Sequence, residues 1–209
     1  MALLLLALLL SYLAGSFPTS LIVAKKFKGI DIREHGSGNA GGTNVLRVVG
    51  WKAALLVAAV DVGKGALAAG LIWRIAAPVP LDGPSLAAAA GAAVVLGHVF
   101  PVFAGFRGGK GVGTAAGVMA VLHPLALAAC VPLFAGVVAL TRIVSLASVC
   151  SALAFPVAVL CIGGPAWVRS NPLPSGIVAA LALFIVFTHR SNLKRLMAGT
   201  ENRFGQGPA

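Results

Sequence analysis

Long apolar runs separated by short polar segments dominate this sequence. Seven such runs fall at residues 2–24, 53–76, 84–104, 112–128, 129–141, 146–163 and 175–188. A helix needs about 20 apolar residues to cross the hydrocarbon core of a bilayer. We therefore expect an all-α integral membrane protein with seven transmembrane helices, which form a single domain over residues 1–209.

The fourth and fifth runs are the least distinct of the seven. Residues 112–141 form either one long kinked helix or two spans hinged at His123-Pro124. A single helix over this stretch would be about 45 Å long, which exceeds a core thickness of about 30 Å. We therefore divide the stretch into two spans.

The composition agrees with a membrane protein. Of the 209 residues, 59% are hydrophobic and only 10% are charged, whereas soluble domains are about 25% charged. This excludes an ordinary soluble globule and an intrinsically disordered chain. Sixteen Lys and Arg against five Asp and Glu give a formal net charge of +11. Such an excess suggests an anionic lipid surface or an anionic substrate.

The basic residues indicate the orientation of the spans. With the N-terminus outside, thirteen of the sixteen basic residues fall in the cytoplasmic segments 25–52, 105–111, 141–145 and 189–209. The positive-inside rule favours this arrangement, which places the C-terminus in the cytoplasm. The outer loops look like Pro-rich turns. We therefore expect the functional site at the cytoplasmic surface.

The first cytoplasmic segment contains the glycine-rich stretch GSGNAGGTN. It matches the dinucleotide pattern GxGxxG, but no strand precedes it, so we reject that interpretation. The N–H groups of such a stretch can converge on an anion, and a nearby Arg can grip a phosphate. The alternative is a flexible turn. The candidates are Gly36, Ser37, Gly38, Asn39, Gly41, Thr43, Asn44 and Arg47.

The second cytoplasmic segment, FRGGKGVGT, resembles a Walker A loop. It fails at both ends, because Ala104 replaces the first Gly of that motif and Gly111 replaces its Ser or Thr. A nucleotide hydrolase is therefore not expected. Gly108, Gly109 and Gly111 nevertheless surround Lys110 where a new helix begins, and a helix start with small residues and a cation suits phosphate.

Other features of the spans have structural explanations. Gly113 and Gly117 continue a spacing of four residues from the second loop, which is typical of close helix packing. Asp61 and Lys64 lie inside the second span, so we expect an ion pair or polar contact within the bundle. His98 is either a buried hydrogen-bonding residue or part of the site.

The last two cytoplasmic segments are short and polar. Arg142 and Ser145 could face the site, although Ser145 would also be a good N-cap for the next span. His189, Asn192 and Arg195 recur every three residues, which places them on or near one helix face. The alternative for this segment is a basic amphipathic tail on anionic lipid.

Acidic residues are too few and too scattered to form a hard-cation site. We expect no metal and no cofactor, and we expect Glu201 to pair with a nearby base. A nucleic-acid partner is not expected either, because the basic residues flank membrane spans.

Three blocks of this sequence closely resemble the bacterial acyl-phosphate:glycerol-3-phosphate acyltransferase (PlsY) family. They are DIREHGSGNAGGTNVLRVVG, GHVFPVFAGFRGGKGVGT and HRSNLKRLMAGTEN, at 31–50, 97–114 and 189–202. The shorter stretches SFPTS, DVGKG and RIVSLAS resemble it as well. The likeness extends over nearly the whole chain in order and spacing.

The resemblance implies a seven-span enzyme of the bacterial inner membrane with a cytoplasmic active site. Such an enzyme transfers a fatty acyl group from acyl phosphate to the 1-hydroxyl of glycerol 3-phosphate, giving lysophosphatidic acid and phosphate. A soluble phosphate acyltransferase would supply the acyl phosphate, and neither acyl-CoA nor a metal is implied. An acyltransferase that uses acyl-CoA and a small anion transporter are the alternatives.

This chemistry suits the residues identified above. Acyl phosphate carries a good leaving group, so we expect the glycerol hydroxyl to attack directly, without an acyl-enzyme. A substrate phosphate or His189 would accept the proton. The expected catalytic residues are Ser37, Arg47, Lys110, His189 and Asn192. The expected phosphate-binding residues are Gly36, Gly38, Asn39, Gly41, Thr43, Asn44, Gly108, Gly109, Gly111, Arg142 and Ser145.

Overall fold

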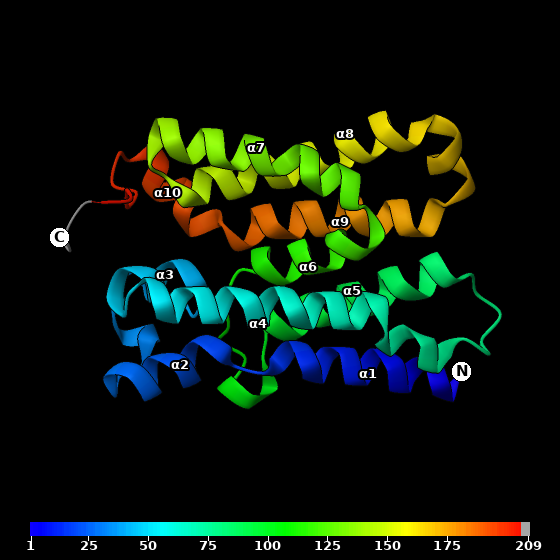
Figure 1. Cartoon of the computed structure of the whole chain (residues 1–209), viewed down its shortest axis with the longest axis horizontal. Coiled ribbons are helices and arrows are strands. Elements are labelled where there is room, and N and C mark those ends of the chain that lie inside the picture. Colours follow the sequence, from blue (N-terminus) through cyan, green and yellow to red (C-terminus); the bar gives the residue numbers. More distant parts are fainter. Residues whose placement is uncertain (206–209) are drawn as a thin grey trace. The chain divides into compact units, whose positions relative to one another are not determined.

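The computed structural model describes residues 1–205, and all regular structure among them is helical (Figure 1). The chain divides into two compact units, Met1–Leu122 (unit 1) and His123–Ala209 (unit 2). Unit 1 contains α1 (Ala2–Ser16), α2 (Thr19–Lys28), η1 (Ile32–Glu34), α3 (Gly42–Val48), α4 (Trp51–Gly70), η2 (Ile72–Ala76), α5 (Gly83–Val99), η3 (Val102–Ala104) and α6 (Val112–Leu122). Unit 2 contains α7 (Pro124–Thr141), α8 (Val144–Ser170), α9 (Pro172–Thr188) and α10 (Arg190–Met197).

Five helical segments among the described residues are long and apolar enough to cross a membrane. They become six if α9 and α10, which meet at a bend of 53°, count as one span. Each of the seven predicted spans overlaps a helix, but α6 has only 11 residues. It is therefore about 16 Å long, half the thickness of a bilayer core. Seven crossings thus remain a prediction.

The predicted division of the fourth and fifth spans is wrong by several residues. The break falls at His123, as the hinge at His123-Pro124 predicts, and not between residues 128 and 129. The reason is that Pro124 occupies the first position of α7. Proline there needs no intrahelical hydrogen-bond partner and its fixed φ suits a helix start.

The first predicted span is also interrupted. It consists of α1 and α2, which are separated at Phe17 and Pro18. Because Pro18 has no N–H to continue the helix, the chain turns there and α2 restarts at Thr19. The first two residues of α2, Thr19 and Ser20, are consequently buried inside unit 1.

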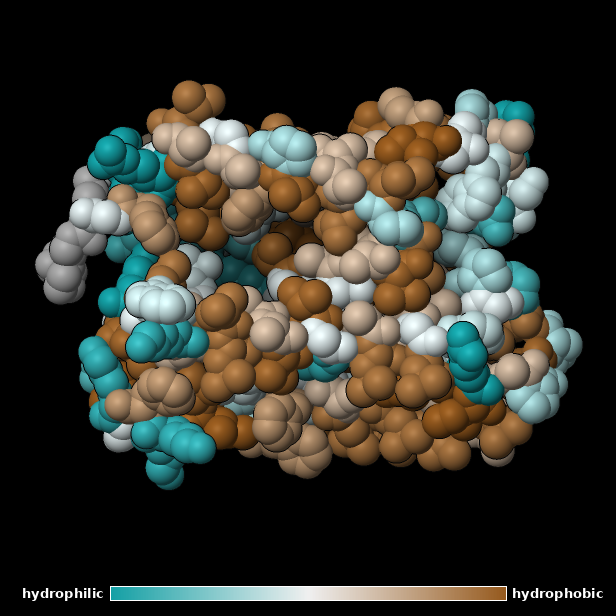
Figure 2. Space-filling view, in the orientation of Figure 1, coloured by the Kyte–Doolittle hydropathy of each residue, from teal (hydrophilic) through white to brown (hydrophobic). Residues whose placement is uncertain are grey.

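Small residues allow the helices of unit 1 to pack closely. α4 lies against α6, and α1 lies against α5. A methyl group on Gly117 of α6 would collide with the carbonyl of Val62 on α4, and one on Gly65 would collide with the carbonyl of Thr114. This confirms close helix packing at Gly117. Figure 2 shows apolar side chains along the middle of α1 and α4 and hydrophilic ones gathered near α2 and α3.

Unit 2 is built around α8, which packs against both α7 and α9. α8 is kinked at Gly164, where φ is 76°, directly before Pro165. Large apolar side chains such as Leu140, Val157 and Leu183 are exposed on these helices. Exposed apolar flanks of this kind are expected of helices that face lipid.

Candidate functional site

The first glycine-rich loop, residues 36–41 between η1 and α3, is held in shape by one buried asparagine. The Nδ2 of Asn44 donates to the carbonyls of Ile32, His35 and Asn39 at 3.0, 2.9 and 3.1 Å. Its Oδ1 accepts from the N–H of Ser37 at 2.9 Å. Asn44 is only 1% exposed. Its amide therefore shapes the loop from beneath.

Apart from the buried Ala40, the remaining residues of the first loop lie at or near the surface. Ser37 and Asn39 are half-buried, whereas Arg47, in the last turn of α3, is exposed. Gly36 has a φ of 60°, and a methyl group there would collide with Asn44 Oδ1. Glycine is thus required at Gly36 both for its backbone conformation and for its contact.

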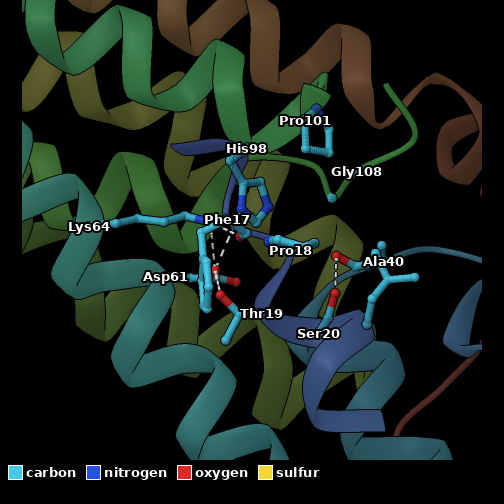
Figure 3. A pocket seen from close by; sticks show the side chains of 12 residues that line it. Phe17, Pro18, Thr19, Ser20, Ala40, Asp61, Lys64, His98, Pro101 and Gly108 are labelled. Carbon is cyan, nitrogen blue, oxygen red and sulfur yellow. Dashed lines mark hydrogen bonds and ion pairs between the residues drawn. The ribbon is translucent and has the colours of Figure 1, made fainter. Parts of the chain in front are cut away.

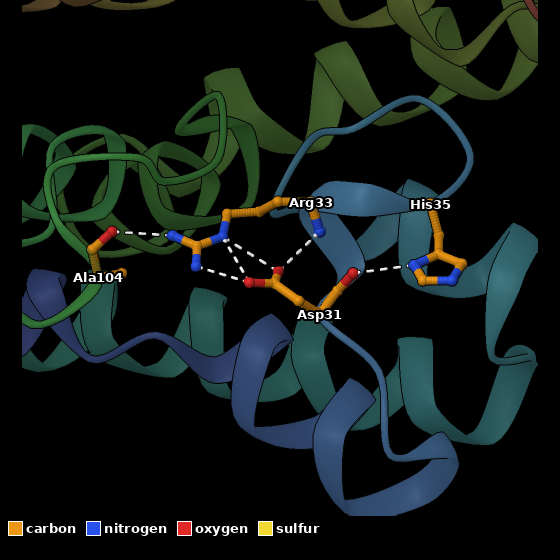
Figure 4. Close-up of polar contacts among 4 residues, drawn as sticks. All are labelled: Asp31, Arg33, His35 and Ala104. Carbon is orange, nitrogen blue, oxygen red and sulfur yellow. Dashed lines mark hydrogen bonds and ion pairs between the residues drawn. The ribbon is translucent and has the colours of Figure 1, made fainter.

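Arg33, just before this loop, contacts Ala104, the residue that directly precedes the second glycine-rich loop at residues 105–111 (Figure 4). Arg33 contacts Asp31 through Nε, at 3.0 and 3.1 Å, and through a terminal nitrogen, at 2.6 Å. Its other terminal nitrogen donates to the carbonyl of Ala104 at 3.0 Å. Hydrogen bonding from the Arg33 side chain lowers the pKa of Asp31 below its usual value, against a smaller effect of burial.

The second glycine-rich loop, residues 105–111, turns back onto the end of α5. The N–H groups of Gly108 and Gly109 donate to the carbonyls of Val99 and His98, each at 3.2 Å. These two amides therefore fix the loop to α5. Lys110, which is half-buried, follows them directly, and α6 begins two residues later.

The two loops meet inside unit 1. Ala40 of the first loop and Gly108 and Gly109 of the second line one small cavity (Figure 3). A methyl group on Gly109 would lie 2.9 Å from the Ala40 carbonyl oxygen. Ser20 holds that same carbonyl with a 2.9 Å hydrogen bond. The structure thus brings together two segments that are about 70 residues apart in sequence.

In unit 2, a single carboxylate gathers three of the predicted polar residues. Glu201 Oε1 accepts hydrogen bonds from Ser145 Oγ and Asn192 Nδ2, each at 2.7 Å. Its Oε2 lies 2.8 Å from Arg195 Nε. Burial favours a higher pKa for Glu201, but the hydrogen bonds from Asn192, Ser145 and Arg195 outweigh it and lower the pKa. The predicted pairing of Glu201 with a base is confirmed.

His189 lies at the junction of α9 and α10 and is almost fully buried. Its Nδ1 is 2.7 Å from the carbonyl of Ile185. Since a carbonyl accepts and does not donate, Nδ1 carries the hydrogen in this contact. In a neutral ring the other nitrogen, Nε2, is then the one that can accept a proton.

The turn between α7 and α8 differs from one prediction. α8 begins at Val144 without a side-chain cap, so Ser145 is not its N-cap. The Ser145 hydroxyl points to Glu201 instead. Arg142 is exposed, and its carbonyl accepts the N–H of Phe204 at 2.6 Å. The third and fourth predicted cytoplasmic segments thus meet within unit 2.

Comparison with known proteins decides the family. The model of the family described as Glycerol-3-phosphate acyltransferase matches residues 5–199. The chain belongs to the glycerol-3-phosphate acyltransferase family. Relatives that carry this name include one from Chlorobaculum tepidum, 41% identical with 96% of each chain covered. Another, from Salinibacter ruber, is 45% identical, with 94% of this chain and 90% of the relative covered.

Two solved structures are similar to this family member. Both are crystal structures of PlsY (YgiH), an integral membrane glycerol 3-phosphate acyltransferase, in its glycerol 3-phosphate and lysophosphatidic acid forms. They are 35% identical, with TM-scores of 0.84 and 0.82, and 97% of this chain is covered. The similarity covers 96% and 95% of those two chains. This glycerol-3-phosphate acyltransferase family member is thus an acyltransferase and an integral membrane protein.

The sequence patterns missed part of what the structure of this family member contains. They treated Arg33 only as a positive charge, and they did not connect Thr19 or Ser20 with either loop. Polar residues directly after Pro18, next to an apolar run, were the available signal. Asp61 and Lys64 do form the expected ion pair, with Lys64 Nζ 2.9 Å from Asp61 Oδ1. Among residues 1–205, no group of three or more His, Cys, Asp or Glu is placed to hold a metal.

Proposed function

We propose that this chain transfers a fatty acyl group from acyl phosphate to the 1-hydroxyl of sn-glycerol 3-phosphate. The hydroxyl oxygen attacks the acyl carbon and the carbon–oxygen bond to phosphate breaks. The products are lysophosphatidic acid and inorganic phosphate. The observation that carries this proposal is the 35% identity, over 97% of the chain, to a protein solved in glycerol 3-phosphate and lysophosphatidic acid forms.

The geometry of unit 1 supports the proposal. Both substrates carry a phosphate, and two glycine-rich loops meet here, each with a basic residue close by, Arg47 and Lys110. In this proposal Ser37, Arg47 and Lys110 position and polarise the reacting groups. The other phosphate-binding residues are Gly36, Gly38, Asn39, Gly41, Thr43, Asn44, Gly108, Gly109 and Gly111.

Two features of these loops refine the roles we propose. Asn44 acts by shaping the first loop, since its amide contacts Ser37 and three carbonyls. Gly108 and Gly109 act by bringing the loop backbone close to α5, because their N–H groups are bonded to it. Lys110 and Gly111, nearer the start of α6, are then better placed to provide phosphate donors.

Unit 2 contributes the remaining catalytic groups in this proposal. His189 Nε2 or a substrate phosphate accepts the proton of the attacking hydroxyl. Asn192 and Ser145 are held by Glu201 and orient a substrate, and Arg142 adds positive charge. The acyl phosphate is an activated donor, so the enzyme needs to position the reactants and stabilise the developing oxyanion. We propose that both units act as one acyltransferase domain.

The site faces the cytoplasm of a bacterial inner membrane in this proposal, with seven crossings and the N-terminus outside. In unit 2, Ser145 contacts Glu201, and both lie in segments expected on the cytoplasmic side. In unit 1, Arg33 of the first cytoplasmic segment contacts Ala104, which directly precedes the second one. A soluble phosphate acyltransferase would supply the acyl phosphate from that side.

One assay tests the donor and the reaction together. Purified protein in detergent receives glycerol 3-phosphate with either acyl phosphate or acyl-CoA, without added metal, and lysophosphatidic acid is measured. We expect product with acyl phosphate. Product with acyl-CoA alone would contradict the proposed donor. Absence of product with both donors, together with uptake of an anion into proteoliposomes, would favour a transporter.

A further inference from the structure

A cluster of ionisable side chains lies buried inside unit 1, beneath both glycine-rich loops (Figure 3). Asp61 and Lys64 are 5% and 7% exposed on α4, and His98 is 8% exposed in the last turn of α5. None of the three belongs to the set of catalytic and phosphate-binding residues proposed above. We propose that Asp61 and His98 form a buried carboxylate–imidazole pair that positions the second loop against the first. This inference rests on the proposed function.

Asp61 is the centre of the cluster. Its Oδ1 lies 2.9 Å from Lys64 Nζ, 3.2 Å from Thr19 Oγ1 and 3.6 Å from His98 Nδ1. A carboxylate buried among helices needs such partners, because an unpaired charge in a low-dielectric region is strongly unfavourable. Replacing a buried ion pair by apolar side chains often leaves stability unchanged or increases it. A contribution to stability is therefore a weak explanation for the presence of these buried charged residues.

His98 connects this carboxylate to the second loop. Its Nδ1 lies 3.6 Å from Asp61 Oδ1, and the opposite edge of the ring, with Nε2, faces Gly109. The approach is so close that a methyl group on Gly109 would collide with Nε2. The backbone adds a second connection, since the carbonyl of His98 accepts the Gly109 N–H at 3.2 Å. Carboxylate–imidazole contacts commonly fix ring orientation in this way.

The same cluster reaches the first loop. Thr19 contacts Asp61, and its neighbour Ser20 donates to the carbonyl of Ala40 at 2.9 Å. That carbonyl is the one that faces Gly109. In this proposal His98 and Asp61 therefore set the distance between the first loop, at Ala40, and the second loop, at Gly109. Both are positioning residues, because they act through the loop backbone and neither belongs to the proposed substrate contacts.

Two measurements test this inference with the variants His98→Ala, Asp61→Asn and their combination. His123→Ala is the matched control, because His123 is a half-buried histidine in unit 2 with aromatic neighbours and no proposed role. The first measurement is the KM for each phosphate-bearing substrate and kcat, in detergent. The second is amide hydrogen exchange of the peptide that covers residues 105–111.

We expect His98→Ala to lower kcat/KM about 10²-fold, as misplaced binding groups do, mainly through a higher KM for one of the two substrates. Asp61→Asn should raise the same KM. The kcat/KM of the double variant should be within about twofold of that of the less active single variant, because both substitutions disrupt the same contact. Exchange at residues 105–111 should increase in all three variants. The control should match the wild type in every value.

Several outcomes would overturn the inference. A lower kcat with both KM values unchanged would indicate only a smaller folded fraction. Multiplicative effects of the two substitutions would show that Asp61 does not act through His98. If amide hydrogen exchange at residues 105–111 were unchanged, His98 and Asp61 would not position the second loop, even if the variant had low activity. A wild type that makes no lysophosphatidic acid would contradict the proposed function, and the exchange data would still decide the positioning of the loop.

Discussion

Asn192 Nδ2 lies 2.7 Å from Glu201 Oε1, and both residues are buried in unit 2. The same oxygen accepts the hydroxyl of Ser145, while the other oxygen contacts Arg195. Residues from the first turn of α8 and from α10 thus depend on one carboxylate in the segment that follows α10. Glu201 orients two of the residues that we propose to act on substrate.

The first prediction concerns the contribution of this carboxylate to stability. Glu201→Gln should lower the free energy of unfolding by about 1.5–3 kcal/mol, the usual range for hydrogen bonds to a charged group. The amide that replaces Oε2 cannot accept the Arg195 hydrogen bond. Thermal unfolding in detergent measures the effect, and Glu34→Gln, at an exposed glutamate of unit 1, is the control. Equal melting temperatures for the two variants would contradict this prediction.

The second prediction is the pH dependence of the same contact. The pKa of Glu201 is lowered in the folded protein, so its ionised form stabilises the fold. This stabilisation is complete above the usual glutamate pKa of about 4.3 and is lost as the pH falls through the folded-state pKa. The difference in Tm between wild type and Glu201→Gln should therefore narrow as the pH is lowered below that value. A difference that widens with acid would show that the folded-state pKa is raised.

Much of unit 1 follows from local sequence, but the meeting of its loops does not. Apolar runs and the proline at Pro124 determine where helices lie and break, because both act over a few residues. The contact of Arg33 with Ala104 and of Gly109 with Ala40 depends on how α2, α4 and α5 pack, which no spacing of motifs contains. The hydrogen bonds by which Asn44 shapes the first loop could not be predicted from the sequence for the same reason. An asparagine can bind a substrate phosphate or hydrogen-bond to the backbone of its own loop, and the sequence alone does not distinguish these two roles.

The third prediction tests Asn44 as the residue that shapes the first loop. Asn44→Ala removes four hydrogen bonds in a site that is 1% exposed. At about 0.5–1.5 kcal/mol for each bond, the loss should be about 2–6 kcal/mol. Asn171→Ala, which removes one side-chain hydrogen bond at the end of α8, should cost about 0.5–1.5 kcal/mol. Chemical or thermal unfolding distinguishes them, and equal losses would show that Asn44 does not hold the loop.

The fourth prediction concerns the residues that we propose to contact substrate in unit 1. Ser37→Ala and Arg47→Ala should each lower kcat/KM by about 10²–10³-fold, as loss of a transition-state donor does. Both side chains lie at or near the surface, so the Tm and the amount of protein in the membrane should remain at wild-type values. Arg169→Ala, at an exposed arginine of α8, is the control for lost charge. Wild-type rates for both variants would remove the first loop from the site.

The fifth prediction separates the position of the loops from the stability of the fold. Arg33 uses different nitrogens for Asp31 and for the Ala104 carbonyl, and a lysine ammonium cannot reproduce that planar fork. The ion pair is partly exposed, at 23% and 29% for the two side chains, so Arg33→Lys should reduce stability by less than about 1 kcal/mol.

The effect on activity should be larger than the effect on stability. Arg33 joins the segment before the first loop to the segment before the second, so its loss should let the loops move apart. We expect kcat/KM to fall about tenfold, since small displacements of binding groups are costly in catalysis. Asp31→Asn should act in the same direction because it removes the carboxylate that orients Arg33. Arg74→Lys, at an arginine that stacks on Trp73 away from both loops, should leave kcat/KM unchanged. If Arg33→Lys matched Arg74→Lys in activity, the connection through Ala104 would have no part in catalysis.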